Sequence, residues 1–290
     1  MDFLGEELGM QIFRAAVAAT VLIASVCAAG AQPSTPSSWN GFYMGMNGGY
    51  GWNGRSSTFS PNDPASAVLF PSSPVPGVFG TPSPPANFNV KGGTLGAQIG
   101  WNWQFAPRFL AGLEADLNVG GVEGTGTSNS TLQFLASQTP LIGTTSEDLK
   151  HLGTVRGRFG FLVTDDVLLF GTGGFAYGRL QYETTFLRVS PGLLGISNGG
   201  YGYDCVNGAP CFSASKRTTE TGWTAGGGAE WRLFSALRFK LEYSYVNLGA
   251  KPSYNILATT PTRPLGSSIM VTNSSDLEFH FVRAGLNLAF

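Results

Sequence analysis

The sequence of 290 residues has little charge, little histidine and little cysteine. Only 12% of its residues are charged, against about 25% in an ordinary water-soluble domain. The formal net charge is -1 and no run of like charge occurs, so nothing in the composition attracts nucleic acid. The two histidines and three cysteines do not have the spacing of a metal site, and we expect no metal and no cofactor.

Long apolar runs are also absent, since no stretch reaches the roughly 20 apolar residues of a membrane-spanning helix. The nearest is Ala15 to Ala29, which follows Arg14 and ends in small residues. A basic start, a short apolar core and a small-residue end are typical of a secretory signal peptide, although a buried core helix is the alternative. We therefore predict a signal peptide at 1–31, a flexible Pro/Ser-rich lead-in at 32–38 and one domain at 39–290.

The end of the chain has a clear period-two pattern. Four apolar residues, Val282, Ala284, Leu286 and Leu288, alternate with Arg283, Gly285, Asn287 and Ala289, and the sequence closes on Phe290. This alternation predicts a β-strand with one apolar face and one small or polar face.

Seven further stretches alternate in the same way. The predicted strands cover about 41–52, 95–105, 109–119, 149–162, 167–183, 219–233 and 237–245, and the face assignment of the stretch 167–183 stays open. Long loops are predicted at 53–87, 120–147, 185–216 and 249–275, and short turns at 106–108, 164–166 and 234–236. Strict alternation of long and short connections is typical of membrane β-barrels, whose long loops are extracellular and whose turns are periplasmic.

The bulk of the apolar face decides which way such a barrel faces. Its aromatic side chains are Trp52, Trp101, Trp103, Phe105, Phe109, Phe159, Phe161, Trp223, Trp231, Phe239, Tyr243, Tyr245 and Phe290. An eight-stranded barrel has only just enough interior for ordinary side chains, so this set does not fit inside. We predict that the apolar face contacts lipid and that the face rich in Gly, Thr and Asn lines the lumen.

This orientation places ten charged residues in the lumen. They are Glu114, Asp116, Arg156, Arg158, Glu230, Arg232, Arg238, Lys240, Glu242 and Arg283. Buried charges must be paired and hydrogen-bonded. We therefore expect Glu114 and Asp116 of strand 109–119 to form ion pairs with Arg156 and Arg158 of strand 149–162. The charges of strand 219–233 should likewise pair with those of strand 237–245. Such a network is a plug of ion pairs or, as the alternative, a gate or ion path.

Two cysteines remain after the predicted signal peptide, and both fall in one predicted loop. An even number of cysteines in an exported chain favours a disulfide between Cys205 and Cys211, with two free thiols as the alternative.

Several motifs carry a family resemblance. Trp39-Asn40-Gly41-Phe42-Tyr43, Asn47-Gly48-Gly49-Tyr50-Gly51-Trp52, Gly173-Gly174-Phe175-Ala176-Tyr177-Gly178 and Arg283-Ala284-Gly285-Leu286-Asn287 together resemble the small outer-membrane proteins of the opacity/OmpA-like barrel type, RopB-like branch. The resemblance implies an eight-stranded antiparallel up-and-down barrel with four long extracellular loops, located in the outer membrane.

The resemblance also implies partners and a role. Arg283, Gly285, Leu288 and Phe290 resemble the C-terminal signal that the barrel-assembly machinery reads. The other implied partners are outer-membrane lipid, lipopolysaccharide and an external ligand or host surface. The implied role lies in envelope integrity and surface interaction. A small solute or ion channel is the alternative.

A barrel hydrolase has the least support from the sequence. His280 lies near Asp276 and Glu278, but the spacing does not match the Ser-His-acid or Asp-His arrangements of membrane-barrel hydrolases. We therefore predict no catalytic residue and expect His280 to lie at the membrane interface.

Overall fold

The computed structural model describes residues 39–61, 85–134, 137–188, 210–249, 252–258, 268–274 and 276–290. The predicted signal peptide and lead-in lie outside these described residues. No helix in the described ranges is long and apolar enough to span a membrane. The described strands are β1 (Gly41–Pro61), β2 (Ala86–Ala106), β3 (Phe109–Phe134), β4 (Ser137–Thr164), β5 (Val167–Arg188), β6 (Pro210–Arg232), β7 (Leu237–Asn247), β8 (Ser253–Ala258), β9 (Ser268–Ser274) and β10 (Glu278–Ala289).

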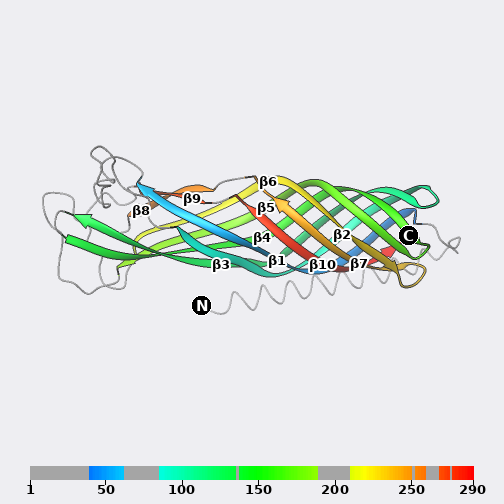
Figure 1. Cartoon of the computed structure of the whole chain (residues 1–290), viewed down its shortest axis with the longest axis horizontal. Helices are drawn as coiled ribbons and strands as arrows, with labels where there is room; N and C mark the ends of the chain where they lie inside the picture. Colours follow the sequence, from blue (N-terminus) through cyan, green and yellow to red (C-terminus); the bar gives the residue numbers. More distant parts are fainter. Residues whose placement is uncertain are drawn as a thin grey trace. The chain divides into compact units, whose positions relative to one another are not determined.

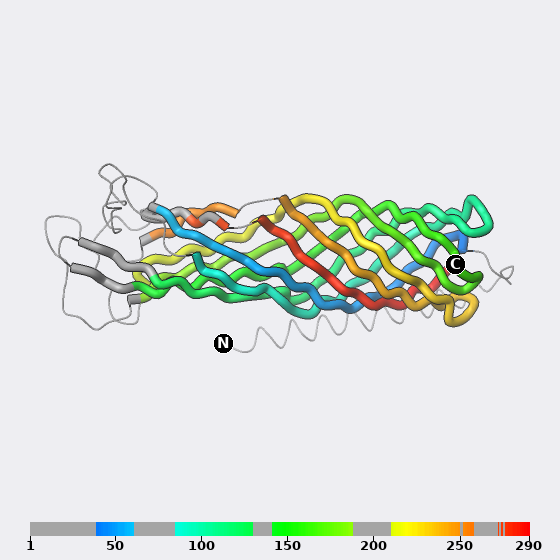
Figure 2. The backbone as a smooth tube through the Cα atoms, viewed as in Figure 1, coloured from blue at the N-terminus to red at the C-terminus, as the bar shows by residue number. Residues whose placement is uncertain are grey.

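Eight of the described strands close into an antiparallel ring in the order β1-β2-β3-β4-β5-β6-β7-β10. The last strand closes the ring on the first, with Tyr43 opposite Ala289 and Trp52 opposite His280. Figure 2 shows β1 in blue running beside β10 in red. The predicted eight-stranded up-and-down barrel and its three short turns are confirmed.

The predicted orientation of the two faces is also confirmed. Leu113 and Phe159 on the apolar face are 62% and 56% exposed on the outer surface, whereas Arg156 on the polar face is 1% exposed. The open face assignment of β5 is settled in the same sense, because Phe175 is exposed and Thr172 is buried. The large aromatic side chains of the predicted apolar face therefore surround the barrel, as Phe159 does.

The predicted long loops are partly wrong. β3 and β4 continue as a paired hairpin through most of the expected loop 120–147, and Thr127 lies opposite Thr144 in it. β1 and β2 extend into the expected loop 53–87, and β5 and β6 extend into 185–216. Composition misled the prediction, because Thr is a good strand former that is frequent in polar loops as well.

The fourth expected loop, 249–275, contains the strands β8 and β9, which lie beyond the ends of β7 and β10 (Figure 1). β7 and β10 end near Asn247 and Glu278. Beyond that level β9 pairs with β1, and β8 pairs with both β9 and β6. The described strands β1-β2-β3-β4-β5-β6-β8-β9 thus continue the barrel, and we call this part the upper barrel.

The upper barrel reverses the chemistry of its two faces. Outward positions of β3 and β4 become polar, as at Glu123, Thr125 and Ser146, while Val122 and Leu149 point inward and are buried. This is the pattern of a barrel surrounded by water. The apolar outer band ends where the reversal begins, so the upper barrel stands clear of the predicted membrane.

The interior is filled in layers that can be followed along β4. Leu162 belongs to an apolar cluster beside the short turns, with Trp39, Leu110, Leu168 and Phe170. Arg158 and Arg156 follow, and next come Leu152 and Leu149 within a second apolar cluster that includes Phe279 and Phe281. The lumen therefore alternates between apolar and charged layers along its length.

The lipid-facing band gives a direct test. We expect Leu113→Arg, in the middle of the band, to lower the free energy of unfolding by about 2–4 kcal/mol in bilayers, because a cation at that depth is poorly solvated. Thr127→Arg, on the outer surface of the upper barrel, should change it little. Urea unfolding in lipid vesicles, followed by heat-modifiable gel migration, measures both. Equal destabilisation by the two changes would contradict the assigned boundary.

Candidate functional site

The charged layer of the lumen is centred on Arg156. Its Nη2 donates to Glu114 Oε1 at 2.6 Å and to Asp116 Oδ2 at 2.9 Å, and its Nη1 donates to Glu242 Oε1. Glu114 and Asp116 come from the neighbouring strand β3, whereas Glu242 comes from β7 on the far side of the lumen. Arg156 therefore ties opposite walls of the barrel together, as a guanidinium with five donors can.

Two further cations complete this cluster. Lys240 Nζ donates to both carboxylate oxygens of Glu114, at 2.6 and 2.8 Å, and lies 3.0 Å from Glu242 Oε2. Arg283 Nη1 donates to Asp116 Oδ1 at 3.0 Å. Each of the three carboxylates thus contacts more than one cation, which offsets the cost of removing it from water.

A second group joins the cluster on the side of the short turns. Arg158 Nη2 donates to Glu230 Oε2 at 2.6 Å, and its Nη1 donates to the Tyr43 hydroxyl at 2.9 Å. That hydroxyl donates to Glu114 Oε2 at 2.6 Å. Gly100 allows this arrangement, because a Cβ at that position would lie 2.3 Å from the Tyr43 ring.

The layer is electrically balanced. Four carboxylates, Glu114, Asp116, Glu230 and Glu242, face four cations, Arg156, Arg158, Lys240 and Arg283, and all eight residues are buried. Neutral amides extend the network, because Asn287 Nδ2 donates to Glu230 Oε1 at 3.1 Å. We call these eight charged residues the ionic plug.

The two remaining predicted lumen residues lie elsewhere. Arg232 and Arg238 cover the buried Trp39 ring, with their Cζ atoms 5.1 and 4.4 Å from its centroid. β6 and β7 are neighbouring strands, but the ion pairs expected between them differ, because Glu230 binds Arg158 of β4. Trp39 Nε1 donates to the Asp165 carbonyl oxygen at 3.1 Å and so fixes the ring beside the short turns.

A separate ion pair lies inside the upper barrel. Arg55 Nη2 donates to Glu147 Oε1 at 2.8 Å, and the Arg55 Cζ atom lies 4.6 Å from the centre of the Phe279 ring. Burial raises the pKa of the Glu147 carboxyl, and the Arg55 guanidinium opposes that rise. This pair closes the interior above the second apolar cluster.

The predicted C-terminal signal and disulfide are only partly described. Arg283 and Gly285 point into the lumen, and Phe290 is exposed. Their recognition by the assembly machinery stays a prediction. Cys211 is buried and disulfide-bonded. Cys205 lies outside the described residues, so the pairing of Cys205 with Cys211 also stays a prediction.

The two histidines lie on the outer surface. His280 stacks on Trp52 with ring centroids 5.8 Å apart, and its Nδ1 lies 2.7 Å from the Tyr243 hydroxyl. This places His280 in the aromatic rim of the lipid-facing band. The described ranges contain no group of three His, Cys, Asp or Glu side chains that could hold a metal ion.

The sequence analysis missed several residues of the filled interior, among them Trp39, Tyr43, Arg55 and Glu147. Tyr43 could have been found, because it has the inward parity of Asn47 on the same strand. Arg55 and Glu147 could not, because they fall in stretches expected to be loops.

The ionic plug predicts a large and specific loss of stability. Arg156→Ala leaves three carboxylates short of their common partner, and we expect the free energy of unfolding to fall by about 3–5 kcal/mol. Urea unfolding in detergent, followed by heat-modifiable migration, is the measurement. The exposed turn residue provides a matched control, because Arg108→Ala should change stability by less than about 0.5 kcal/mol. Equal stability of the two variants would show that the plug contributes little.

Known proteins resemble this chain along nearly its whole length. A 31 kDa outer-membrane immunogenic protein of Brucella melitensis is 28% identical over 278 residues, which cover 95% of this chain and 93% of the relative. A protein of the same name from Brucella suis matches equally well. Among solved structures, the outer membrane protein OprG of Pseudomonas aeruginosa has a TM-score of 0.45 at 13% identity, covering 89% of this chain and 100% of that one. Neisserial surface protein A has a TM-score of 0.34 at 10% identity, covering 86% and 97%.

The family of the chain follows from a family model. The model of the outer membrane protein beta-barrel domain matches residues 19–290, which include the ring of β1 to β7 and β10. The closed barrel, its apolar outer band and this match agree, and the chain therefore belongs to the outer membrane protein beta-barrel family and resides in the cell outer membrane.

Proposed function

We propose that this protein is a closed barrel that contributes to envelope integrity and holds its upper barrel and loops outside the cell for contact with an external ligand or host surface. The observation that carries the proposal is the filled interior. Arg156 bridges opposite walls, and apolar clusters around Phe170 and Phe281 lie on either side of the ionic plug. A molecule built in this way acts through its outer surface and not through a pore.

The upper barrel supports the surface role. β3 and β4 are 26 and 28 residues long, whereas a tilted strand needs about 9–11 residues to cross a membrane. The additional length forms a hydrogen-bonded sheet closed by β8 and β9. Binding residues are often carried by loops on such a scaffold. The Brucella relatives are named as immunogenic outer-membrane proteins, which is consistent with an exposed surface.

The alternatives have less support. A channel would need a continuous aqueous path, but side chains fill the described lumen. A hydrolase would need a histidine beside a nucleophile or an acid in a cleft. His151 and His280 instead lie on the outer surfaces of β4 and β10, which are not neighbouring strands.

The closed lumen predicts that the protein does not conduct ions. Purified protein in a planar bilayer should give no stepwise conductance under conditions in which a 16-stranded porin conducts, because eight strands leave no open channel. Heat-modifiable migration of the same sample would verify that the barrel is folded. Regular conductance steps from folded protein would favour the channel alternative.

The proposed orientation predicts which positions can be labelled on living cells. Thr127→Cys lies on the outer surface of the upper barrel, and Ser235→Cys lies in the short turn between β6 and β7. A membrane-impermeant maleimide should label Thr127→Cys on intact cells, and Ser235→Cys only after the outer membrane is broken. The parent protein provides the background from its own cysteines. Labelling of Ser235→Cys alone on intact cells would show that the barrel has the opposite orientation to the proposed one.

A further inference from the structure

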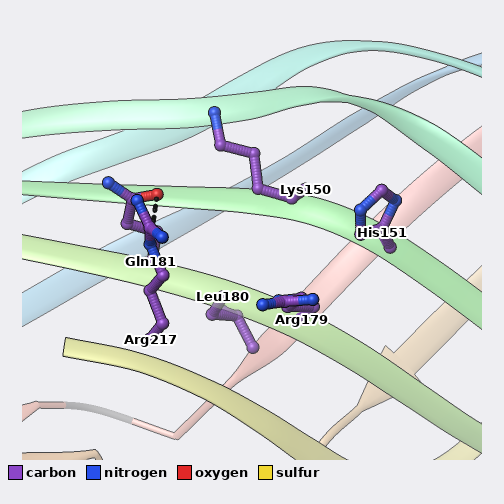
Figure 3. Close-up of a pocket in the computed structure, with 6 residues that line it drawn as sticks. All are labelled: Lys150, His151, Arg179, Leu180, Gln181 and Arg217. Carbon is purple, nitrogen blue, oxygen red and sulfur yellow. Dashed lines mark hydrogen bonds between the residues drawn. The ribbon is translucent and has the colours of Figure 1, made fainter.

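A cationic pocket lies on the outer surface of β4, β5 and β6. It has a volume of about 180 Å³ and is lined by Lys150, His151, Arg179, Leu180, Gln181 and Arg217. Figure 3 shows that Lys150 and His151 come from one strand, Arg179 and Gln181 from the next, and Arg217 from the third. Nothing in the plugged lumen or in the surface role described above uses these residues.

An irregularity in β4 creates the pocket. Leu149 lies opposite Leu180 and His151 lies opposite Arg179, so Lys150 is an extra residue between two regular pairs. Leu149 and Leu152 both remain buried, and two consecutive residues, Lys150 and His151, therefore face outward. Such β-bulges often re-aim a side chain at a functional site. Here the bulge directs Lys150 to the surface that carries Arg179.

The nearby charges leave a positive excess in the pocket. Lys150 Nζ donates to the Asp148 carboxylate on the same strand, which balances that cation. Arg179 and Arg217 are both exposed, and Arg217 Nε donates to the neutral Gln181 Oε1 at 3.3 Å. Other carboxylates of this surface, Glu123 on β3 and Glu183 on β5, lie on the side away from the apolar band.

The level of the pocket along the barrel points to its ligand. Tyr177, the next outward residue below Arg179, is 37% exposed, and Val119, opposite His151, is 40% exposed. Both belong to the lipid-facing band, so the cations begin where that band ends. Elsewhere the rim of the band carries stacked rings, as at Trp52 and His280. A lipid suits this position, because its charged headgroup can contact the cations while its acyl chains lie on the apolar band.

We propose that the cationic pocket binds the phosphate group of a glycolipid anchored in the outer leaflet beside the barrel. The guanidinium groups of Arg179 and Arg217 contact phosphate oxygens, as arginine forks do. Lys150 exchanges its Asp148 contact for a third phosphate contact. The acyl chains lie along the band beneath, against Phe175 and Tyr177. The pocket requires the orientation given in the proposed function, because only then does it face the leaflet that carries such lipids.

The test uses diphosphoryl lipid A as the probe. Folded full-length protein in detergent micelles is titrated with the fluorescent lipid, and the dissociation constant Kd is measured for two variants. We expect Arg179→Gln/Arg217→Gln to bind about 30-fold more weakly than the parent, from two lost cation contacts at a membrane surface. The matched control, Lys91→Gln/Arg108→Gln, removes the same charge from exposed positions outside the pocket and should bind like the parent.

Each other outcome contradicts a defined part of the proposal. Equal Kd values for the two variants would show that the pocket is not the lipid-binding site. If the lipid binds equally well after its phosphates are removed enzymatically, phosphate is not the group that the pocket recognises. Competition by inorganic phosphate at the concentration of the lipid would assign the pocket to free phosphate. The cysteine-labelling experiment tests the orientation separately, so a failure of the proposed function is distinguishable from a failure of this site.

Discussion

The neutralisation of buried charge is the constraint on which this barrel depends. Four carboxylates and four cations occupy one layer of the lumen, and all of them are buried away from bulk water. Each ion is costly to bury alone, and the layer is stable only when all partners are in place. Contacts such as Arg156 with Glu242 join strands that are not neighbours in the sheet. The plug therefore holds the closed shape of the barrel and also closes its lumen.

The same strands are surrounded by lipid along one part of their length and by water along the other. In the lower part, lipid surrounds the ring and the apolar side chains point outward. In the upper part, water surrounds it and residues such as Val122 and Phe59 turn inward. Period-two alternation makes this reversal simple, because only the side chains change while the ladder of hydrogen bonds continues. The bulge at Lys150 lies close to the boundary, where the two patterns meet.

Much of the fold could be predicted because it is encoded locally. The alternation from Leu95 to Phe105 predicts a strand with one apolar face. The bulk of the aromatic side chains on that face shows that it contacts lipid and does not fill the core. The upper barrel could not be predicted so readily, because Thr125 and Ser146 have the composition of a loop. The sequence predicted the ion pairs of Arg156 with Glu114 and Asp116, but not the pairs between strands that are not neighbours. The parity of Glu230 shows that it points inward, but only the curvature of the ring brings it to Arg158 instead of to the adjacent strand.

The upper barrel has a consequence for the order of assembly. β8 pairs with β6, and β9 pairs with β1. β6 and β1 come within two strands of each other only after β10 has paired with β1. Before that closure, the entropy cost of bringing residues so distant in sequence together opposes the bridge. The upper ring is therefore expected to form last, as a late step that follows insertion. Until then the edges of β1 and β6 that β9 and β8 cover would remain unpaired.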